Sequence, residues 1–199
     1  MDVARVMDNT LAYRLWQAPF AAEKFAPVLA HNDLRCIRRV LDVGCGPGTN
    51  AAYFSHAEYL GIDMNPKYVE HARRTYGRKF VAADVTQLEV APGEQFDFIL
   101  VNSLLHHIDL DGVEKLLAHL ATLLTKDGHI HIIELVLPEG ASVARFLARA
   151  DRGKYPRPLA QWRTLFTESF DAEVFEPFTL RRAGVDLWRL VYFKGRAKR

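Results

Sequence analysis

The chain has 199 residues, of which 49% are hydrophobic and 25% charged, and its formal net charge is +2. This length suits one domain, and the composition excludes a disordered or fibrous chain. The small charge, with much of its basic excess in residues 194–199, disfavours a nucleic-acid-binding surface, so we interpret this end as a solvated tail. Cys36 and Cys45 have no framework spacing, and no stretch reaches the roughly 20 apolar residues of a membrane span. We expect a cytoplasmic protein, a monomer or homodimer, without disulfides or membrane spans.

The first 37 residues are predicted to form a helical cap. Residues 9–31 carry aliphatic and aromatic side chains at helical spacing, and Pro19 and Pro27 should break this helix. Residues 38–136 then alternate apolar runs with amphipathic stretches. Strands are expected at residues 38–43, 59–63, 80–82, 96–101 and 129–136, and helices at 49–56, from Pro66 to about Tyr76, and at 113–124.

Near-continuous apolar strands that alternate with helices predict a doubly wound α/β fold with a parallel sheet covered on both faces. Residues 137–199 depart from this alternation. A helical stretch at 159–166 precedes two β-like runs, 172–180 and 186–194, joined by Ala183 and Gly184. These runs predict a hairpin, so one strand must run antiparallel. We expect one domain over residues 1–199, with a core at 38–136.

A glycine-rich turn follows the first strand of this core, at Gly44, Gly46 and Gly48. Glycines here let backbone amides and a helix N-terminus approach a ligand. Asp63 and Asp84 end the next two strands, the first about 20 residues beyond the turn, where an acid can accept hydrogen bonds from ribose hydroxyls. The pattern predicts a nucleoside pocket. Two alternatives stay open: Asp63 as the N-cap of the helix at Asn65-Pro66, and Asp84 as a plain turn residue.

Five motifs together resemble the class I S-adenosylmethionine-dependent methyltransferases, in particular the small-molecule group similar to ubiquinone and menaquinone methyltransferases. They are Val-Leu-Asp-Val-Gly-Cys-Gly-Pro-Gly-Thr (40–49), Gly-Ile-Asp-Met-Asn-Pro (61–66), Ala-Ala-Asp-Val (82–85), Phe-Asp-Phe-Ile-Leu-Val-Asn-Ser-Leu-Leu-His-His (96–107) and Asp-Gly-His-Ile-His-Ile-Ile-Glu (127–134). The resemblance implies a seven-stranded, mostly parallel Rossmann-like sheet closed by an antiparallel C-terminal hairpin strand, with S-adenosyl-L-methionine as cofactor.

The resemblance also implies a set of cofactor-binding residues. The turn would lie under the methionine part, with Asp42 supporting it; Asp63 would hold the ribose, Met64 would pack on the adenine, Asp84 and the Val85 backbone would read the adenine edge, and Asn102 would lie at the methionine end. The predicted cofactor-binding residues are Asp42, Gly44, Cys45, Gly46, Gly48, Asp63, Met64, Asp84, Val85 and Asn102.

Two other functions compete with this reading. A nicotinamide dinucleotide site would want a third glycine or alanine where the chain has Thr49, and Pro47 and Asp84 also favour the methyltransferase. A cofactor-binding protein that transfers no methyl group, regulatory or cyclase-like, is the second alternative, because fold does not determine function.

Methyl transfer needs mainly alignment of the acceptor with the methyl group, and a general base is optional. The candidates for such a base are His106, His107 and Glu134, with Asp109 less favoured, although the two histidines could equally pack and hydrogen-bond a turn. No metal site is predicted, because His129 and His131 lack an evident third ligand.

The least regular segments should choose the acceptor, which we expect to be a small molecule and not a nucleic acid. The aromatic residues of the cap suggest a flat or lipophilic acceptor, or equally a core contact against the sheet. The cap residues considered are Tyr13, Trp16, Gln17, Phe20 and Lys24, and the second segment is 146–162 with Tyr155. Arg14 and Lys24 are candidates to pair with the cofactor carboxylate. Residues 151–158 suit an acidic acceptor, although a solvated loop is the plainer reading.

Overall fold

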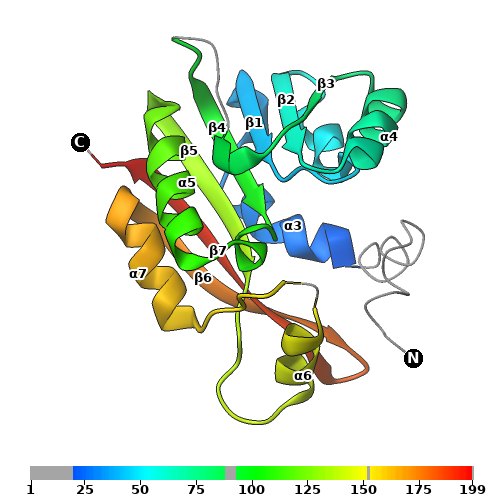
Figure 1. Ribbon diagram of the computed structural model, residues 1–199, viewed down its shortest axis with the longest axis vertical. Coiled ribbons are helices and arrows are strands. Elements are labelled where there is room, and N and C mark those ends of the chain that lie inside the picture. The colour runs from blue at the N-terminus through cyan, green and yellow to red at the C-terminus, as the bar shows by residue number, and fades with distance from the viewer. Residues whose placement is uncertain (1–19, 88–92, 152, 199) are drawn as a thin grey trace.

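The computed structural model describes residues 20–87, 93–151 and 153–198, which form a seven-stranded sheet with helices on both faces (Figure 1). The strands are β1 (Arg39–Val43), β2 (Glu58–Asp63), β3 (Lys79–Ala82), β4 (Phe96–Asn102), β5 (Leu124–Leu135), β6 (Phe170–Arg182) and β7 (Val185–Ala197). The α-helices are α3 (Ala21–Ala30), α4 (Pro66–Tyr76), α5 (Leu110–Thr122), α6 (Val143–Ala150) and α7 (Leu159–Ser169). Four 3-10 helices complete the described elements: η2 (Leu34–Cys36), η3 (Thr49–Phe54), η4 (Val85–Gln87) and η5 (Leu105–His107).

The strand order is β3-β2-β1-β4-β5-β7-β6, with parallel pairing from β3 to β5 and antiparallel pairing of β7 with both neighbours. The doubly wound α/β class and the antiparallel C-terminal hairpin are therefore confirmed. The hairpin turns at Ala183 and Gly184, which lie between β6 and β7 and have φ of +49° and +78°. No described helix combines the length and the apolarity that a membrane crossing requires.

Successive side chains of the central strands point to opposite faces and enter two separate hydrophobic clusters. Ile99 and Val101 join the cluster of α5 and α7, whereas Phe98 and Leu100 join the cluster of α3 and α4. All four strand side chains are fully buried. Because both faces of β4 are covered, this strand carries the unbroken apolar run that the sequence shows.

Two expectations about element boundaries are wrong. Pro27 lies inside α3 instead of breaking it, and Pro19 lies outside the described residues. The second correction concerns β5, which begins at Leu124, five residues earlier than predicted, because Leu124 pairs with Phe96 across an irregularity in the register. The helix predicted after the turn that follows β1 is present as the 3-10 helix η3.

Candidate functional site

The strand order reverses between β1 and β4, since β2 and β3 extend to one side of β1 and β4 lies on the other. Val43 at the end of β1 lies beside Ile62 of β2 and Val101 of β4. The segments that follow these three parallel strands therefore leave the sheet at the same edge. In open α/β sheets the crevice at such a switch point is the usual ligand site.

The glycine turn leaves β1 at this point and is bonded to the end of β2. The amides of Gly44 and Cys45 both donate to the carbonyl oxygen of Ile62, at 2.8 and 2.9 Å. The amide of Gly46 donates to Oδ2 of Asp63 at 2.8 Å. The Cys45 thiol is buried, and this burial raises its pKa. The turn and the acid at the end of β2 thus form one bonded unit.

Two glycines of the turn have side chains packed against them. Gly48 has φ of +82°, and a Cβ there would lie 2.9 Å from the Cβ of Ala72 and from the ring of Phe80. Gly44 has φ of +70°, and a Cβ there would lie 2.9 Å from Leu104, which follows β4. Left-handed backbone with this little space admits only glycine without strain. The turn is therefore held between α4 on one side and the segment after β4 on the other.

Asp42 is fully buried at the end of β1, beneath the turn. Its Oδ2 accepts hydrogen bonds from the Tyr59 hydroxyl at 2.5 Å and from Nδ2 of Asn50 at 3.2 Å. These bonds connect β1 to Tyr59 on β2 and to Asn50 on η3. Burial raises the pKa of this carboxyl to about 6, although both hydrogen bonds act in the opposite direction. Oδ1 of Asp42 and Oδ1 of Asn102 are buried without a partner among the described residues. Buried oxygens of this kind call for a donor from a ligand or a water.

The carboxylate of Asp63 is half-buried, and its Oδ1 accepts the amide of Asn65 at 2.8 Å. The N-cap of α4 is Asn65, whose side chain accepts the amide of Lys67, so the alternative that Asp63 caps this helix is wrong. A carboxylate offers about four acceptor positions, and the two amides leave part of Asp63 available. Beside it, Met64 is 68% exposed at the mouth of the site.

Asp84 is half-buried just beyond β3, and its Oδ1 accepts the amide and the hydroxyl of Thr86 at 2.9 and 2.8 Å. This is a local turn contact, so a turn role for Asp84 stays open beside a ligand role. Val85 is buried and starts η4. Because Asp63 pairs with Ala82 on β3, both acids lie at the same edge of the sheet. The two carboxylates, the Asp42 and Asn102 oxygens without a partner among the described residues, and the glycine turn fit a ligand that combines a nucleoside with an amino group.

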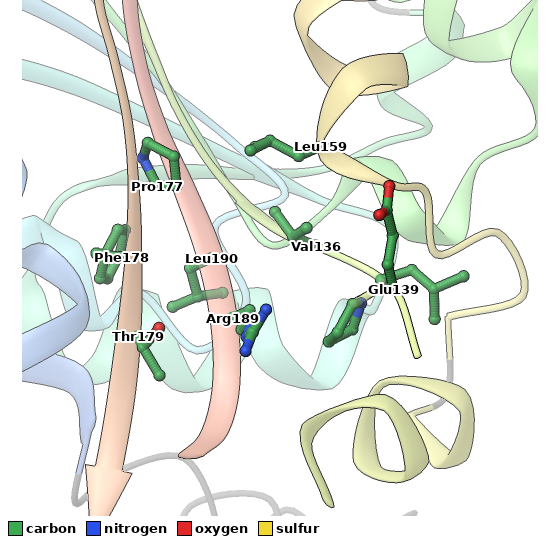
Figure 2. Close-up of a pocket in the computed structure, with 10 residues that line it drawn as sticks. Val136, Glu139, Leu159, Pro177, Phe178, Thr179, Arg189 and Leu190 are labelled. Atoms are coloured by element: carbon green, nitrogen blue, oxygen red, sulfur yellow. The ribbon is translucent and has the colours of Figure 1, made fainter. Parts of the chain in front are cut away.

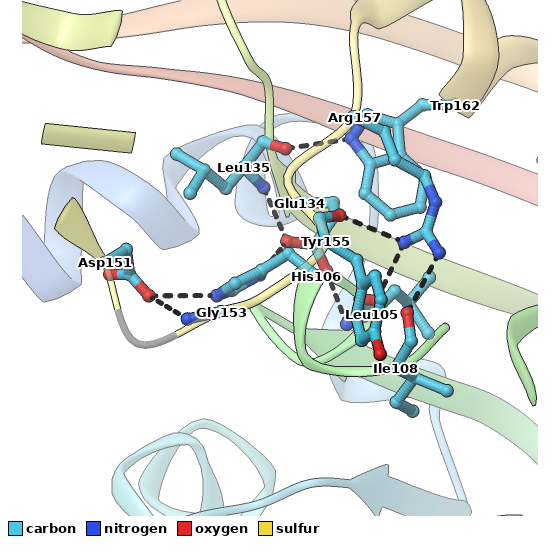
Figure 3. Close-up of polar contacts among 10 residues, drawn as sticks. All are labelled: Leu105, His106, Ile108, Glu134, Leu135, Asp151, Gly153, Tyr155, Arg157 and Trp162. Carbon is cyan, nitrogen blue, oxygen red and sulfur yellow. Dashed lines mark hydrogen bonds and ion pairs between the residues drawn. The ribbon is translucent and has the colours of Figure 1, made fainter. Parts of the chain in front are cut away.

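A second polar cluster lies where β4 and β5 end (Figure 3). His106 Nδ1 lies 2.5 Å from Oε1 of Glu134, which is fully buried. The same carboxylate accepts the amides of Leu105 and Leu135, at 2.7 and 2.6 Å. Burial alone would raise the pKa of Glu134, but the His106 charge and these hydrogen bonds lower it. Glu134 is therefore an ionised carboxylate with several donors around it.

The other ring nitrogen of His106 also faces a carboxylate. Its Nε2 lies 3.3 Å from Oδ1 of Asp151, which also accepts the amide of Gly153 at 3.1 Å. Burial opposes the charge of His106, but Glu134 and Asp151 together raise its pKa to about 9. The His106 hydrogen bond in turn helps to lower the pKa of Asp151 to about 2, against the effect of burial. An imidazole with acceptors on both nitrogens is an imidazolium, so His106 does not offer a basic nitrogen in this arrangement.

Lys24 and His107 also lie close to this cluster. Lys24 of α3 is half-buried; burial lowers its pKa to about 8, against the opposing charges of Glu134 and Asp151. The exposed ring of His107 lies 4.2 Å from that of His106, centroid to centroid. Ligand atoms of His106, His107 and Asp151 lie within 4.8 Å of one another, a spacing that a metal ion could bridge.

The remaining histidine and acid candidates serve other contacts. His131 is buried between the stacked rings of Phe98 and Tyr192, and His129 contacts Glu173 at 3.1 Å. Asp109 caps α5 through the amide of Gly112. These residues do not join the cluster at His106.

Asp151 and Arg157 belong to no motif, so the sequence indicated them only as members of the segment 151–158. Arg157 is only 5% exposed, so a solvated loop is wrong at this position. Its guanidinium donates to the carbonyl oxygens of Leu105 at 3.1 Å and Ile108 at 2.9 Å. The prolines on both sides of Arg157 were the available signal, since they favour a fixed extended segment. Trp162, included in the predicted acceptor segment, is instead fully buried in the core.

Comparison with known proteins identifies the family of the chain. Residues 40–128 match the family model described as a methyltransferase domain. The trans-aconitate 2-methyltransferase of Escherichia fergusonii is 31% identical over 193 residues, with 87% of this chain and 69% of that protein covered. The structure of the YcgJ protein from Bacillus subtilis matches with a TM-score of 0.68 and 18% identity, over 89% of this chain and 99% of that one. The structure of the N-methyltransferase NodS from Bradyrhizobium japonicum in complex with S-adenosyl-l-homocysteine matches with a TM-score of 0.66 and 17% identity. This match covers 100% of this chain and 93% of that one.

The chain therefore belongs to the class I S-adenosylmethionine-dependent methyltransferases. It is an enzyme that uses S-adenosylmethionine to methylate a small molecule.

Proposed function

We propose that this methyltransferase transfers the methyl group to a carboxylate oxygen of a small polycarboxylate. The observation that carries the proposal is the pairing of His106 with Glu134 and Asp151. Phenols, hydroxyls and ammonium groups must lose a proton before or during attack, whereas a carboxylate is already deprotonated at neutral pH. A site whose best-placed histidine is already an imidazolium suits an acceptor that needs no base. The relative that acts on trans-aconitate, a tricarboxylate, supports the same class of acceptor.

For the cofactor we propose the residue roles that the resemblance implies. The turn formed by Gly44, Cys45, Gly46 and Gly48 would lie under the methionine part, with room above Gly46, where a Cβ would meet no atom within 4 Å. The Asp42 and Asn102 oxygens that lack a partner among the described residues support a contact with its amino group. The remaining proposed contacts are those of Asp63 to the ribose, Met64 to the adenine face, and Asp84 with Val85 to the adenine edge.

When bound, S-adenosylmethionine supplies a methyl group that an aligned nucleophile displaces in line. The chain's contribution is to orient the acceptor and to exclude water at the ends of β4 and β5. We assign the contact with an acceptor carboxylate to Lys24. The charges of Glu134 and Asp151 act on its ammonium, so we place Lys24 beside their cluster, at the acceptor end of the site. The pairing of Lys24 with the cofactor carboxylate stays the alternative, and Arg14, the other candidate for it, lies outside the described residues. His107 and Glu134 stay candidates for a base only if the acceptor carries a proton.

The test is transfer of a labelled methyl group from the cofactor to a panel of trans-aconitate, saturated di- and tricarboxylates, phenols and amines. A carboxylate acceptor gives a methyl ester, which mild alkali hydrolyses to volatile labelled methanol. Lys24→Met should raise the acceptor KM at least tenfold and leave cofactor affinity within about twofold. Label that appears only in alkali-stable products would overturn the proposal. The flat or lipophilic acceptor stays a prediction, since Tyr13 and Trp16 lie outside the described residues; the phenols in the panel test it.

A further inference from the structure

The residues after α6 run across the ends of β4 and β5 as an extended segment, here called the strap and defined as Asp151 and residues 153–157 (Figure 3). Its far end is bonded to the sheet. Arg157 makes an isolated parallel bridge with Val136, and its carbonyl oxygen accepts the amide of Leu137 at 2.8 Å. The Arg157 guanidinium meanwhile bonds the carbonyl oxygens after β4. This end of the strap is therefore fixed by several hydrogen bonds.

The near end of the strap is seated on His106. The amide of Tyr155 donates to the carbonyl oxygen of His106 at 2.9 Å, and Asp151 faces the Nε2 of the same residue. At Gly153 a Cβ would lie 2.0 Å from Cδ2 of His106, so the backbone of the strap rests directly on the imidazole ring. No other side chain could occupy position 153 without displacing the strap or the ring. His106 is consequently 4% exposed, although it follows a surface turn.

The charges around the ring come from three elements of the chain. Glu134 is on β5 and Asp151 begins the strap, and both face the ring. Lys24 of α3 adds positive charge close by, and the ring of His107 on η5 lies 4.2 Å from that of His106, centroid to centroid. The contacts of Glu134 with one ring nitrogen and of Asp151 with the other connect β5 to the strap through the imidazole of His106. A neutral ring could keep only one of its two contacts as a hydrogen bond from an N–H group.

We propose that His106 is a clasp: a doubly donating imidazolium that joins Glu134 to Asp151, seats the strap, and thereby shapes the acceptor site without moving a proton. His106 and Asp151 are then positioning residues, and so is Gly153. The inference rests on the proposed function in one respect, that the acceptor binds beneath the strap. The seating of the strap itself does not depend on which acceptor is used.

The first experiment measures hydrogen exchange of the strap amides in the protein without acceptor. Asp151→Asn should speed exchange at Tyr155 at least tenfold, and Gly153→Ala should do the same without removing a charge. Asp127→Asn is the control, because Asp127 is exposed near the start of β5, whereas Glu134 lies near the end of this strand. Exchange at Tyr155 that stays at the wild-type rate in both strap variants would overturn the clasp, whatever the acceptor proves to be.

The second experiment is steady-state kinetics of the same variants with the acceptor found in the panel. A clasp predicts that the acceptor KM rises at least tenfold, that kcat changes less than threefold, and that cofactor affinity by calorimetry is unchanged. A general base predicts instead that His106→Gln lowers kcat at unchanged KM and removes a limb of the pH profile; that result would overturn the proposal. If no carboxylate is methylated but the exchange result holds, the proposed acceptor fails and the clasp stands.

A third measurement addresses the metal alternative. A melting-temperature increase with zinc sulfate, abolished in His107→Ala, would place a divalent cation between the ring and Asp151, where the clasp has a proton. That outcome would also overturn the proposal, because a coordinated nitrogen cannot donate to Asp151. We expect no zinc-dependent shift in the wild-type protein.

Discussion

His106 and Glu134 meet at 2.5 Å where β4 and β5 end, and neither side chain has appreciable contact with solvent. They come from positions 28 residues apart, and each satisfies the other's charge in the interior. Breaking such a buried pair from one side leaves an uncompensated charge, which typically costs about 3–5 kcal/mol.

Glu134→Gln should therefore lower the free energy of unfolding by about 3 kcal/mol or more, as measured by urea denaturation at pH 7. The matched control is Glu70→Gln, which removes an exposed pair with Arg74 on α4 and should cost less than about 1 kcal/mol. Equal losses in the two variants would contradict a buried ion pair at His106.

The pH dependence of stability should carry the signature of the same histidine. The pKa of His106 is raised from its ordinary 6.5 to about 9 in the folded protein. Between these values the folded state binds more protons than the unfolded state, so this contribution is complete below pH 6.5 and is lost as the pH rises through 9. The difference in free energy of unfolding between the wild type and His106→Gln, measured by urea denaturation from pH 6 to 10, should therefore decrease as the pH rises. The difference between the wild type and Asp151→Asn should decrease less, in the same direction. Differences that do not change with pH for both variants would refute the assignment.

Asp42 should make the folded protein less stable as the pH rises, in contrast to an acid whose pKa is lowered by folding. Burial raises its folded pKa from 3.8 to about 6, so the folded state binds the extra proton and stability falls as the pH rises from about 4 to 6. A shift of this size corresponds to about 3 kcal/mol. Asp42→Asn should remove this decline, as seen in denaturation midpoints from pH 4 to 7. Asp171→Asn, which changes an exposed carboxylate on β6, should leave the decline in place.

Alanine substitutions at two glycines with left-handed backbone separate the effect of a steric clash from the effect of backbone strain. At Gly48 a new Cβ would lie 2.9 Å from Ala72 and Phe80. At Gly77, the C-cap of α4, a new Cβ would have no atom within 4 Å. Gly77→Ala should cost about 1–2 kcal/mol and leave cofactor affinity unchanged. Gly48→Ala should cost more and weaken cofactor binding at least tenfold, as measured by thermal denaturation and calorimetry. Similar affinities in the two variants would mean that the turn does not contact the cofactor.

Asp63 offers the direct test of the cofactor site. Calorimetry should detect S-adenosylmethionine or its demethylated product binding in the micromolar range, and Asp63→Ala should abolish it. The variant loses the acceptor of the Gly46 amide as well as the proposed ribose contact. Asp63→Asn, which can still accept one amide, should keep more stability than Asp63→Ala but little affinity. Tight binding of NAD to the wild-type protein would contradict the assignment.

Much of the cofactor end could be predicted because its information is local. The apolar run of β4, the glycines after β1 and the acids after β2 and β3 are short patterns, and parallel pairing brings them to one edge of the sheet. Boundaries were less predictable where pairing overrides local signals. Gly128 lies within β5 instead of before it, in the register irregularity between the pairs Phe96–Leu124 and Phe98–His129, where a Cβ would lie 2.8 Å from the carbonyl oxygen of Phe96.

The acceptor end, in contrast to the cofactor end, could be predicted only in small part from local sequence patterns. The sequence alone determined the α/β class and the residues of the glycine turn, since each depends on spacing along one or two neighbouring elements, and its resemblance to the methyltransferases implied the cofactor. Only the tertiary structure decided that His106 faces carboxylates on both nitrogens and that Asp151 and Arg157 belong to the site. The physical reason is that the charge state of a buried imidazole depends on groups that folding brings together from β5 and the strap, and no local pattern encodes their meeting.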